Sequence, residues 1–183
     1  MHKLNNSIRD RLNIIEVAVS DENCERKAFY QAPFPDSSSL KGGHPHLKNA
    51  DIIRVKTIKL DDWACKNGIE KVNLLWVDVQ GAEREVLIGA MKLLNNTDYI
   101  FIEYGETLYE GGMTRKETIH LLSDRFKLIS GYSSITERGD LVFINKKLPL
   151  TKKIVLESKI IGILRFFKYQ YMKLRRIIML RKS

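Results

Sequence analysis

The stretch VNLLWVDVQGAEREVLIGAMKLL, residues 72–94, constrains the fold of this 183-residue chain more than any other feature. Residues 72–78 begin as a continuous apolar run, which is typical of a strand buried on both faces, and we expect Trp76 in the core. A helix is predicted from about Ala82 to Leu94, because apolar residues recur there on one side. Gly81 permits a tight turn between the two. A strand followed at once by a helix is typical of α/β domains.

Strands and helices alternate along the rest of the chain as well. We expect strands at residues 12–20, in KAFYQA, in DIIRVKTIKL, at residues 98–104, and in a closing pair formed by KLISGYSS and DLVFINK. Two more helices are expected, the short DDWACKNG, capped by Asp61 or Asp62, and the amphipathic TRKETIHLLSDRF. The sequence therefore predicts an α/β fold with a mostly parallel sheet, in which ligands bind beyond the carboxyl ends of the strands.

One loop is long for a compact domain. The segment PFPDSSSLKGGHPHLKN, about 17 residues rich in Pro, Ser, Gly and Asn, separates two predicted strands. Loops of this length are more often functional than idle. The serines of the loop, which include Ser38 and Ser39, are candidates for contacts with a polar substrate, although loop serines seldom need such a role.

Acidic residues end two of the predicted strands. Asp78 closes the strand at residues 72–78, and a simple explanation is a helix cap, with Glu83 and Glu85 complementing the helix dipole. Glu103, however, ends the neighbouring strand in the same way. Two carboxylates at one edge of a sheet are hard to explain by packing, because an unpaired buried carboxylate is costly. The pattern therefore favours a functional acidic rim formed by Asp78 and Glu103.

The two cysteines and the start of the chain bear on its location. Cys24 and Cys65 lie far apart without a metal-ligand pattern, which favours free thiols in a reducing cytosol. Residues 1–20 show neither a signal peptide nor a transit pattern, so a cytoplasmic location is expected.

Two or three carboxylates would suit Mg²⁺, but no other ligand spacing supports it, and no metal site is predicted.

The net charge of +9 is concentrated at the carboxyl end, which we separate as residues 148–183 from a domain at residues 1–147. Residues 151–183 hold 10 basic residues and one acid, Glu157, so they carry the whole excess. Their apolar residues recur every three or four positions, which predicts a basic amphipathic helix. Its charges interrupt any span long enough to cross a membrane, and its pattern suits the anionic inner surface of one. The alternative is packing on the domain or on a second copy.

The electrically balanced remainder argues against nucleic acid as a partner. Residues 1–150 hold equal numbers of basic and acidic residues, and they contain no recognisable reading motif.

Three segments together resemble a known family. VKTIKLDDW, then VNLLWVDVQGAEREVLIGAMKLL, then YIFIEY, in this order and spacing, resemble the core signature of the FkbM-type methyltransferases. The upstream LNIIEVAVSDENCERKAFYQ and SSSL also resemble that family, so the likeness covers about residues 4–145. The resemblance implies a class I methyltransferase (Rossmann-like) fold, S-adenosylmethionine as cosubstrate, and a hydroxyl acceptor on a sugar, glycan or natural-product precursor.

The resemblance also implies roles for individual residues. Ala18 and Ser20 would lie near the adenine, and Asp78 near the methyl group and the acceptor hydroxyl, as a base or an orienting group. Independently of the resemblance, Glu103 is expected to share the catalytic acidic rim or, like Glu83, to hold the substrate or a metal ion. A carboxylate suits this chemistry, because methyl transfer needs aligned reactants and a group that takes the hydroxyl proton.

One departure from the family pattern affects the expected function. In the family, two strands come before the segment that begins this chain, one followed by a Gly-rich turn and one ending in an acid. This sequence contains neither of them. In the family's sheet these two strands would lie between the strands at residues 12–20 and 72–78. We therefore expect an N-terminally truncated domain. It is either part of an O-methyltransferase that is catalytic in its complete form, or a non-catalytic module that docks on a membrane surface or a partner.

Overall fold

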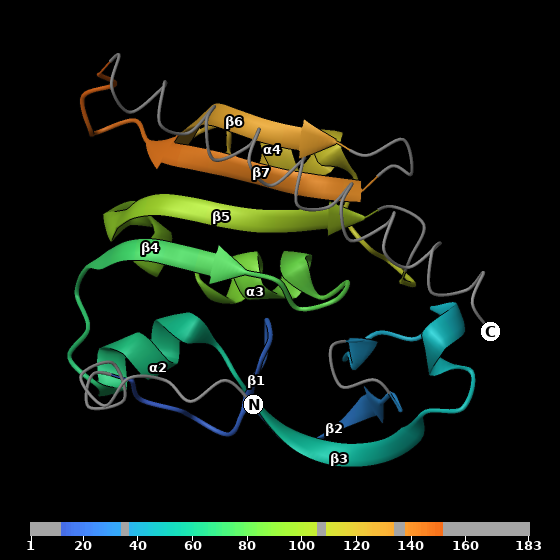
Figure 1. Ribbon diagram of the computed structural model, residues 1–183. Helices are drawn as coiled ribbons and strands as arrows, with labels where there is room; N and C mark the ends of the chain where they lie inside the picture. Colours follow the sequence, from blue (N-terminus) through green and yellow to red (C-terminus); the bar gives the residue numbers. More distant parts are fainter. Residues whose placement is uncertain (1–11, 34–36, 106–108, 134–137, 152–183) are drawn as a thin grey trace.

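A computed structural model describes residues 12–33, 37–105, 109–133 and 138–151 (Figure 1). The strands are β1 (Ala18–Val19), β2 (Cys24–Gln31), β3 (Asp51–Ile58), β4 (Val72–Val77), β5 (Thr97–Gly105), β6 (Phe126–Ser133) and β7 (Arg138–Asn145). The α-helices are α2 (Leu60–Lys66), α3 (Glu83–Gly89) and α4 (Arg115–Leu122), and the short 3₁₀ helices are η2 (Pro45–Leu47) and η3 (Leu93–Asn96). The chain is therefore an α/β protein, as predicted.

The strands form two sheets. One has the order β4-β5-β7-β6, and the other has the order β1-β3-β2. Strand β4 is parallel to β5, and β1 is parallel to β3, whereas the pairs β5-β7, β6-β7 and β2-β3 are antiparallel. The prediction of a mostly parallel sheet is therefore wrong for the described residues. The connection from β6 to β7 is short, and it allows only an antiparallel pair, because a parallel pair needs a crossover of a dozen or more residues.

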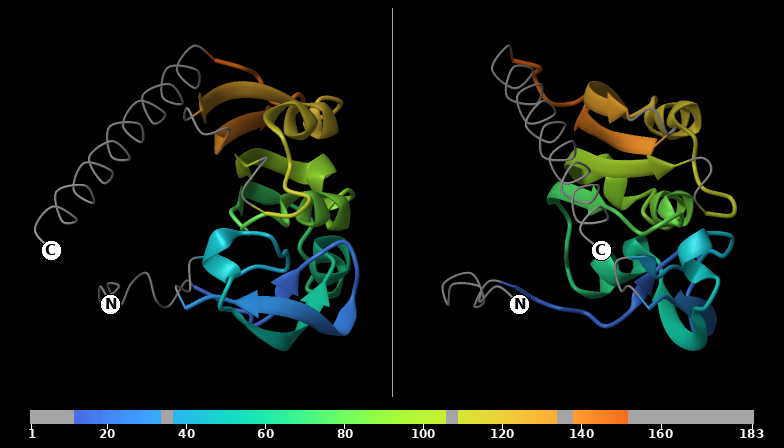
Figure 2. Two further views of the ribbon diagram at one scale, coloured as in Figure 1. Left: turned by 90° about the vertical axis from the view of Figure 1, so that its right-hand side faces the viewer. Right: turned by 45° about the vertical axis from the view of Figure 1, so that its right-hand side comes forward.

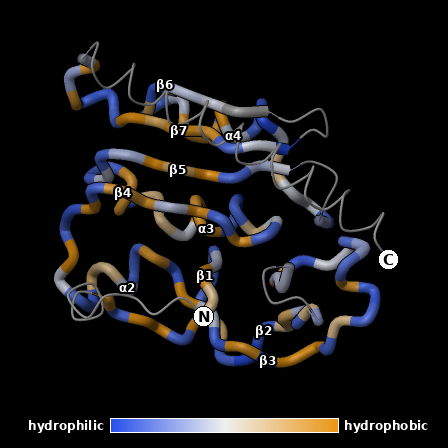
Figure 3. The backbone as a smooth tube through the Cα atoms, viewed as in Figure 1, coloured by the Kyte–Doolittle hydropathy of each residue, from blue (hydrophilic) through white to orange (hydrophobic). Residues whose placement is uncertain are grey.

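The main core lies between the four-stranded sheet and the helices α3 and α4, which cover one of its faces (Figure 2). Strand β5 alternates, so that Ile100, Ile102 and Tyr104 are buried in this core. Helix α3 contributes Val86 and Leu87 on its inner side. Apolar stretches run along β4, β5 and β7, with hydrophilic residues at their ends (Figure 3). The polar strand ends are where the sequence predicts chemistry.

Strand β4 differs from its prediction. Leu74 and Trp76 are 53% and 55% exposed, so β4 is not buried on both faces, and Trp76 does not lie in the core. Both side chains belong to the face of the sheet that points away from α3 and α4, and Trp76 contacts Phe101 of β5 with ring centroids 4.4 Å apart. An apolar run alone did not reveal that one face of the strand is uncovered.

The ends of several elements also differ from prediction. Strand β1 covers two of the nine residues expected. Neither Asp61 nor Asp62 caps α2, whose N-cap residue is Lys59 and has no side-chain bond. The Asp61 carboxylate instead accepts hydrogen bonds from the backbone of Lys92 and Leu93. Helix α3 ends at Gly89, earlier than expected, and η3 follows it.

The other predicted elements are confirmed, namely β2, β3, β5, α4 and the closing pair β6-β7. Cys24 and Cys65 are free thiols. Within the described residues, no helix has both the length and the apolar character needed to cross a membrane. The predicted helix in the basic carboxyl-terminal segment falls almost entirely outside them.

Candidate active site

The pairing of β4 with β5 brings the two predicted acids together. Val77 of β4 lies opposite Ile102 of β5, so Asp78, the next residue, lies opposite Glu103. Strand alternation places both on the face opposite to that of Val77 and Ile102. Asp140 of β7 lies opposite Glu103 on its other side, so three carboxylates stand in a row across the strand ends. Asp140 was not predicted, because the sequence does not show which residue of β7 pairs with Glu103.

Glu103 is half-buried, and its surroundings favour the protonated form. Burial is the largest cause that raises the pKa of Glu103 to about 8, and the charge of Asp78 and a hydrogen bond with Asp78 come next. The charges of Glu83 and Asp140 act in the same direction. Near neutral pH, Glu103 therefore keeps its proton and donates it in a hydrogen bond to Asp78.

The turn after β4 has a strained backbone that Glu83 holds in place. Gln80 has a φ of 55° and Gly81 a φ of 99°. The Glu83 carboxylate accepts hydrogen bonds from the N–H groups of Val79 at 3.3 Å and Gly81 at 3.1 Å. Burial raises the pKa of Glu83, and these backbone hydrogen bonds act against it. Glu83 is 2% exposed, so it faces the turn, and a contact with a substrate would require its carboxylate to leave these bonds.

The side chain of Gln80 connects the acids to a tyrosine. Its amide nitrogen donates to Asp78 Oδ1 at 2.6 Å and lies 3.4 Å from Glu103 Oε2. The hydroxyl of Tyr109 donates to Gln80 Oε1 at 3.1 Å. Gln80 and Tyr109 could not be selected from the sequence, because their contact joins parts of the chain that lie 29 residues apart.

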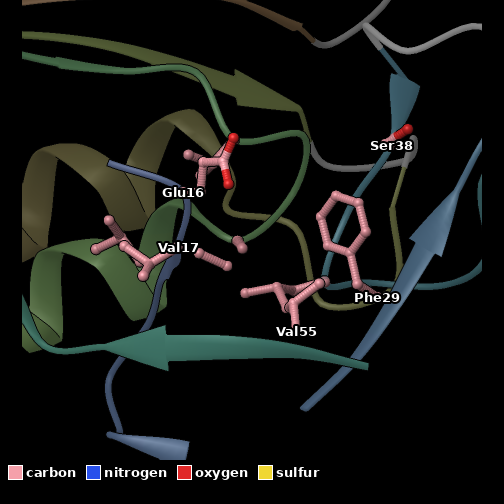
Figure 4. Close-up of a pocket in the computed structure, with 10 residues that line it drawn as sticks. Glu16, Val17, Phe29, Ser38 and Val55 are labelled. Atoms are coloured by element: carbon pink, nitrogen blue, oxygen red, sulfur yellow. The ribbon is translucent and has the colours of Figure 1, made fainter. Parts of the chain in front are cut away.

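An apolar cavity of about 500 Å³ lies on the other side of the turn (Figure 4). Its lining comes from β1 and the two residues before it, from β2, β3, the long loop and the turn itself, and consists of Glu16, Val17, Ala18, Val19, Phe29, Ser38, Leu40, Val55, Val79 and Ala82. The volume is typical of a small-molecule pocket. Ala18, predicted to contact a cosubstrate, is part of this lining, whereas Ser20 is fully buried, where it hydrogen-bonds Asp21 and accepts from Lys27.

The predicted loop serines have different positions. Ser38 lines the cavity, and its hydroxyl accepts a hydrogen bond from the backbone of Ala32. Ser39 is 1% exposed and donates to the carbonyl oxygen of Gln80. Lys41 forms an ion pair with Glu85 of α3. Ser39 thus connects the long loop to the turn, and Lys41 connects it to α3. The Ser39 hydroxyl is buried and bonded to the protein backbone, and it is not open to a substrate.

The turn separates the cavity from the acids. Val79 and Ala82 line the cavity, whereas Gln80, Gly81 and Glu83 line a small depression that Glu103 shares. Asp78 is exposed, so a second molecule can reach it from solvent. A molecule bound in the cavity would therefore lie on one side of the turn, and a molecule bound at Asp78 on the other. This arrangement suits the transfer of a group between two bound molecules, with an acid at the receiving side. Glu16 and Phe29 were not predicted, since nothing in an isolated strand indicates which pocket its side chains enter.

Comparisons with known proteins identify the family to which the chain is similar. Residues 3–133 match the family model of the methyltransferase FkbM domain. Over 153 residues the chain is 34% identical to the 2-O-methyltransferase NoeI of Sinorhizobium fredii (strain NBRC 101917 / NGR234). The alignment covers 76% of this chain and 62% of NoeI, so the chain spans less than two thirds of that relative. No solved structure matches the chain significantly.

Proposed function

Because the chain belongs to the FkbM methyltransferase family, we propose that it transfers a methyl group from S-adenosylmethionine to a hydroxyl of a sugar, glycan or natural-product precursor. The observation that carries the proposal is the position of the paired acids Asp78 and Glu103 next to an apolar cavity, with one turn between them. The relative NoeI is named a 2-O-methyltransferase, which supports oxygen as the atom that receives the methyl group.

The cavity fits the adenosyl part of S-adenosylmethionine. Ala18, Phe29 and Val55 offer apolar surfaces to a flat heterocycle, and Glu16 is the one charged residue among the described residues of the lining. The Glu16 carboxylate would accept hydrogen bonds from an amino or hydroxyl group at the rim (Figure 4). Val79 and Ala82 would direct the sulfonium end toward the acids, because they belong to the turn that separates cavity and acids.

The acids supply the proton transfer. S-adenosylmethionine provides an electrophilic methyl group, so that an O–C bond forms while the C–S bond breaks and its electron pair stays on sulfur. Asp78 takes the proton that the acceptor hydroxyl loses. Glu103, which holds its own proton near neutral pH, donates to Asp78 and removes one negative charge from the cluster. Gln80 fixes the direction of the Asp78 carboxylate through its 2.6 Å hydrogen bond.

The substitution Asp78→Asn tests the role of the base. We expect methyl transfer to fall by about 10²- to 10⁴-fold, with binding of S-adenosylmethionine unchanged, because the amide cannot take the proton. The measurement is transfer of radiolabelled methyl from S-adenosylmethionine to a panel of methyl glycosides. Asp98→Asn is the control, since Asp98 lies near the start of β5 and pairs with Lys71. Equal rates in both variants would exclude Asp78 as the base.

Calorimetric titration of the whole chain tests the cosubstrate separately. S-adenosylmethionine and S-adenosylhomocysteine should both bind with dissociation constants in the micromolar range, about 8 kcal/mol. Phe29→Ala should weaken both, because it removes an apolar wall of the cavity. A folded protein that binds neither compound would contradict the proposal and would favour the alternative of a non-catalytic module.

A further inference from the structure

The orientation of the Gln80 amide decides whether Asp78 and Glu103 face a hydrogen-bond donor or an acceptor. In the structure its nitrogen faces Asp78 at 2.6 Å and Glu103 at 3.4 Å. An amide turned by 180° would present its oxygen to the same two carboxyl groups, and that oxygen cannot donate a hydrogen bond. The backbone of Gln80 does not allow much adjustment, because Ser39 holds its carbonyl oxygen and the next residue, Gly81, is fixed by Glu83. The amide orientation must therefore be set by contacts of the side chain itself.

Tyr109 contacts the oxygen of the Gln80 amide. Its hydroxyl donates to Gln80 Oε1 at 3.1 Å. The ring is 6% exposed and stacks on His44 with centroids 4.6 Å apart and an interplanar angle of 19°. It also packs closely on Gly81, where an added Cβ would lie 2.3 Å from the Tyr109 Cβ. The hydroxyl is therefore held at a defined position next to the amide oxygen.

We propose that Tyr109 is a positioning residue that, through its hydrogen bond to Gln80, holds the Gln80 amide nitrogen toward Asp78 and Glu103 and so favours the ionised form of Glu103. The inference rests on the proposed function, in which Asp78 is the base, and it adds a residue that acts on Glu103, the carboxyl group hydrogen-bonded to that base. Hydrogen bonds donated to a carboxylate favour its charged form.

The groups around Glu103 make this donor important. Asp78 after β4, Glu83 of α3 and Asp140 of β7 face it, and all three are acids that favour its protonated form. Beyond Tyr109 lies His44, whose pKa is lowered by burial and then by its neighbours His46 and Arg138. Against the three acids, the Gln80 amide supplies a neutral hydrogen-bond donor whose direction depends on Tyr109.

Tyr109 also links the acid pair to the long loop. Its hydroxyl lies 3.2 Å from the carbonyl oxygen of Ser37 and 3.1 Å from Gln80 Oε1. A hydroxyl has one hydrogen, so it can donate to one of these acceptors at a time. A shift of Ser37 toward Tyr109 would take the hydrogen from Gln80, and the position of Ser37 would then change the protonation of Glu103.

Carboxyl ¹³C NMR titration of the full chain tests the proposal without any need for activity. Tyr109→Phe keeps the ring and removes the hydroxyl, and the pKa of Glu103, about 8 in the wild type, should rise further. Gln80→Met, which removes the amide at similar volume, should give a rise of the same size. The double variant should rise no further than either single one, because both changes break one chain of hydrogen bonds. Tyr99→Phe, a tyrosine of β5 that lies four residues before Glu103, is the control.

A Tyr109→Phe shift no larger than that of Tyr99→Phe, or additive shifts in the double variant, would overturn the proposal. Thermal melting of each variant checks that the fold is kept. Methyl transfer adds a second readout, in which Tyr109→Phe should lower kcat by about 10-fold with the KM for S-adenosylmethionine unchanged. If the wild-type protein transfers no methyl group, the proposed function fails, while the titration still decides the role of Tyr109.

Discussion

At the scale of single residues, Glu103 couples the site to the stability of the fold. Its pKa is raised from 4.5 to about 8, first by burial and then by Asp78. The folded protein therefore binds more protons than the unfolded chain between these two pH values. The stability contributed by the protonated carboxyl is complete below about pH 4.5, and it is lost as the pH rises to about 8.

Glu103→Gln tests this linkage, because a glutamine stays neutral at every pH. The unfolding free energy of wild type should fall as the pH is raised from 5 to 8.5, whereas the carboxamide of the variant adds no such loss. The difference between Glu103→Gln and wild type should therefore shift by on the order of 2 kcal/mol in favour of the variant over this range. Urea denaturation at the two pH values measures it. Glu117→Gln is the control, because backbone hydrogen bonding at Thr114 lowers the pKa of Glu117, so its linkage lies below pH 4.5 and the variant should follow wild type over this range. A difference between Glu103→Gln and wild type that does not change with pH would contradict the assigned cause.

Gly81 is the second residue on which the site depends. It has a φ of 99°, and an added Cβ would lie 2.3 Å from the Tyr109 Cβ. Gly81→Ala should therefore cost about 2–4 kcal/mol of unfolding free energy, since strain and overlap add. Gly68→Ala separates the two effects, because Gly68 has a φ of 65° and open space around it, and it should cost about 1 kcal/mol. Chemical denaturation measures both, and equal losses would show that Tyr109 yields without cost.

At the scale of elements, α3 connects the two sheets. Its residue Gly89 lies against the backbone that follows β1, where an added Cβ would be 2.2 Å from the Ser20 carbonyl oxygen. The three-stranded sheet therefore approaches α3 as closely as a glycine allows. The apolar cavity depends on this approach, because β1 and the turn before α3 both contribute to its lining.

Gly89→Ala should push β1 away from α3. We expect a loss of about 1–3 kcal/mol of unfolding free energy and weaker binding of S-adenosylmethionine, because the overlapping atom belongs to the backbone. Ile88→Ala, a neighbouring change at a 43% exposed position, should leave binding unaffected. Calorimetry and thermal melting on the two variants measure these effects. Retained affinity in Gly89→Ala would mean that the cavity does not depend on this contact.

The elements also show how far the sequence could predict the fold. Alternation in DIIRVKTIKL and apolar character in YIFIEY located β3 and β5, because these signals are local. The direction of pairing was not local, and the insertion of β7 between β5 and β6 made the larger sheet mixed. Leu74 and Trp76 are exposed because the helices cover the other face of the sheet. The sequence of the strand alone does not indicate which face the helices cover.

The site was predictable to a similar extent. Asp78 and Glu103 could be selected because each follows an apolar strand, and the structure places them opposite each other. Glu83 and Ser39 were predicted to contact substrate, but their hydrogen bonds go to the turn. Whether a polar residue faces a ligand or the backbone depends on packing of distant segments, as the contact between Ser39 and Gln80 illustrates.

At the scale of the whole molecule, the charge is divided between a balanced body and a basic carboxyl-terminal segment. We propose from the sequence that residues 151–183 bind anionic membranes, since they carry the net charge of +9 with a helical apolar repeat. Deleting them should abolish salt-sensitive cosedimentation with phosphatidylglycerol vesicles, while neutral vesicles serve as the control. Unchanged binding after the deletion would exclude this segment as the membrane contact.

The position of β4 at the end of its sheet affects how the protein behaves in bulk. In the part of the chain that the structure describes, its outer backbone N–H and C=O groups have no strand beside them, and Leu74 is exposed next to that edge. A strand edge of this kind is a template for another extended chain. The fraction of soluble protein should consequently fall as the protein concentration rises. Leu74→Lys should delay aggregation, which light scattering measures.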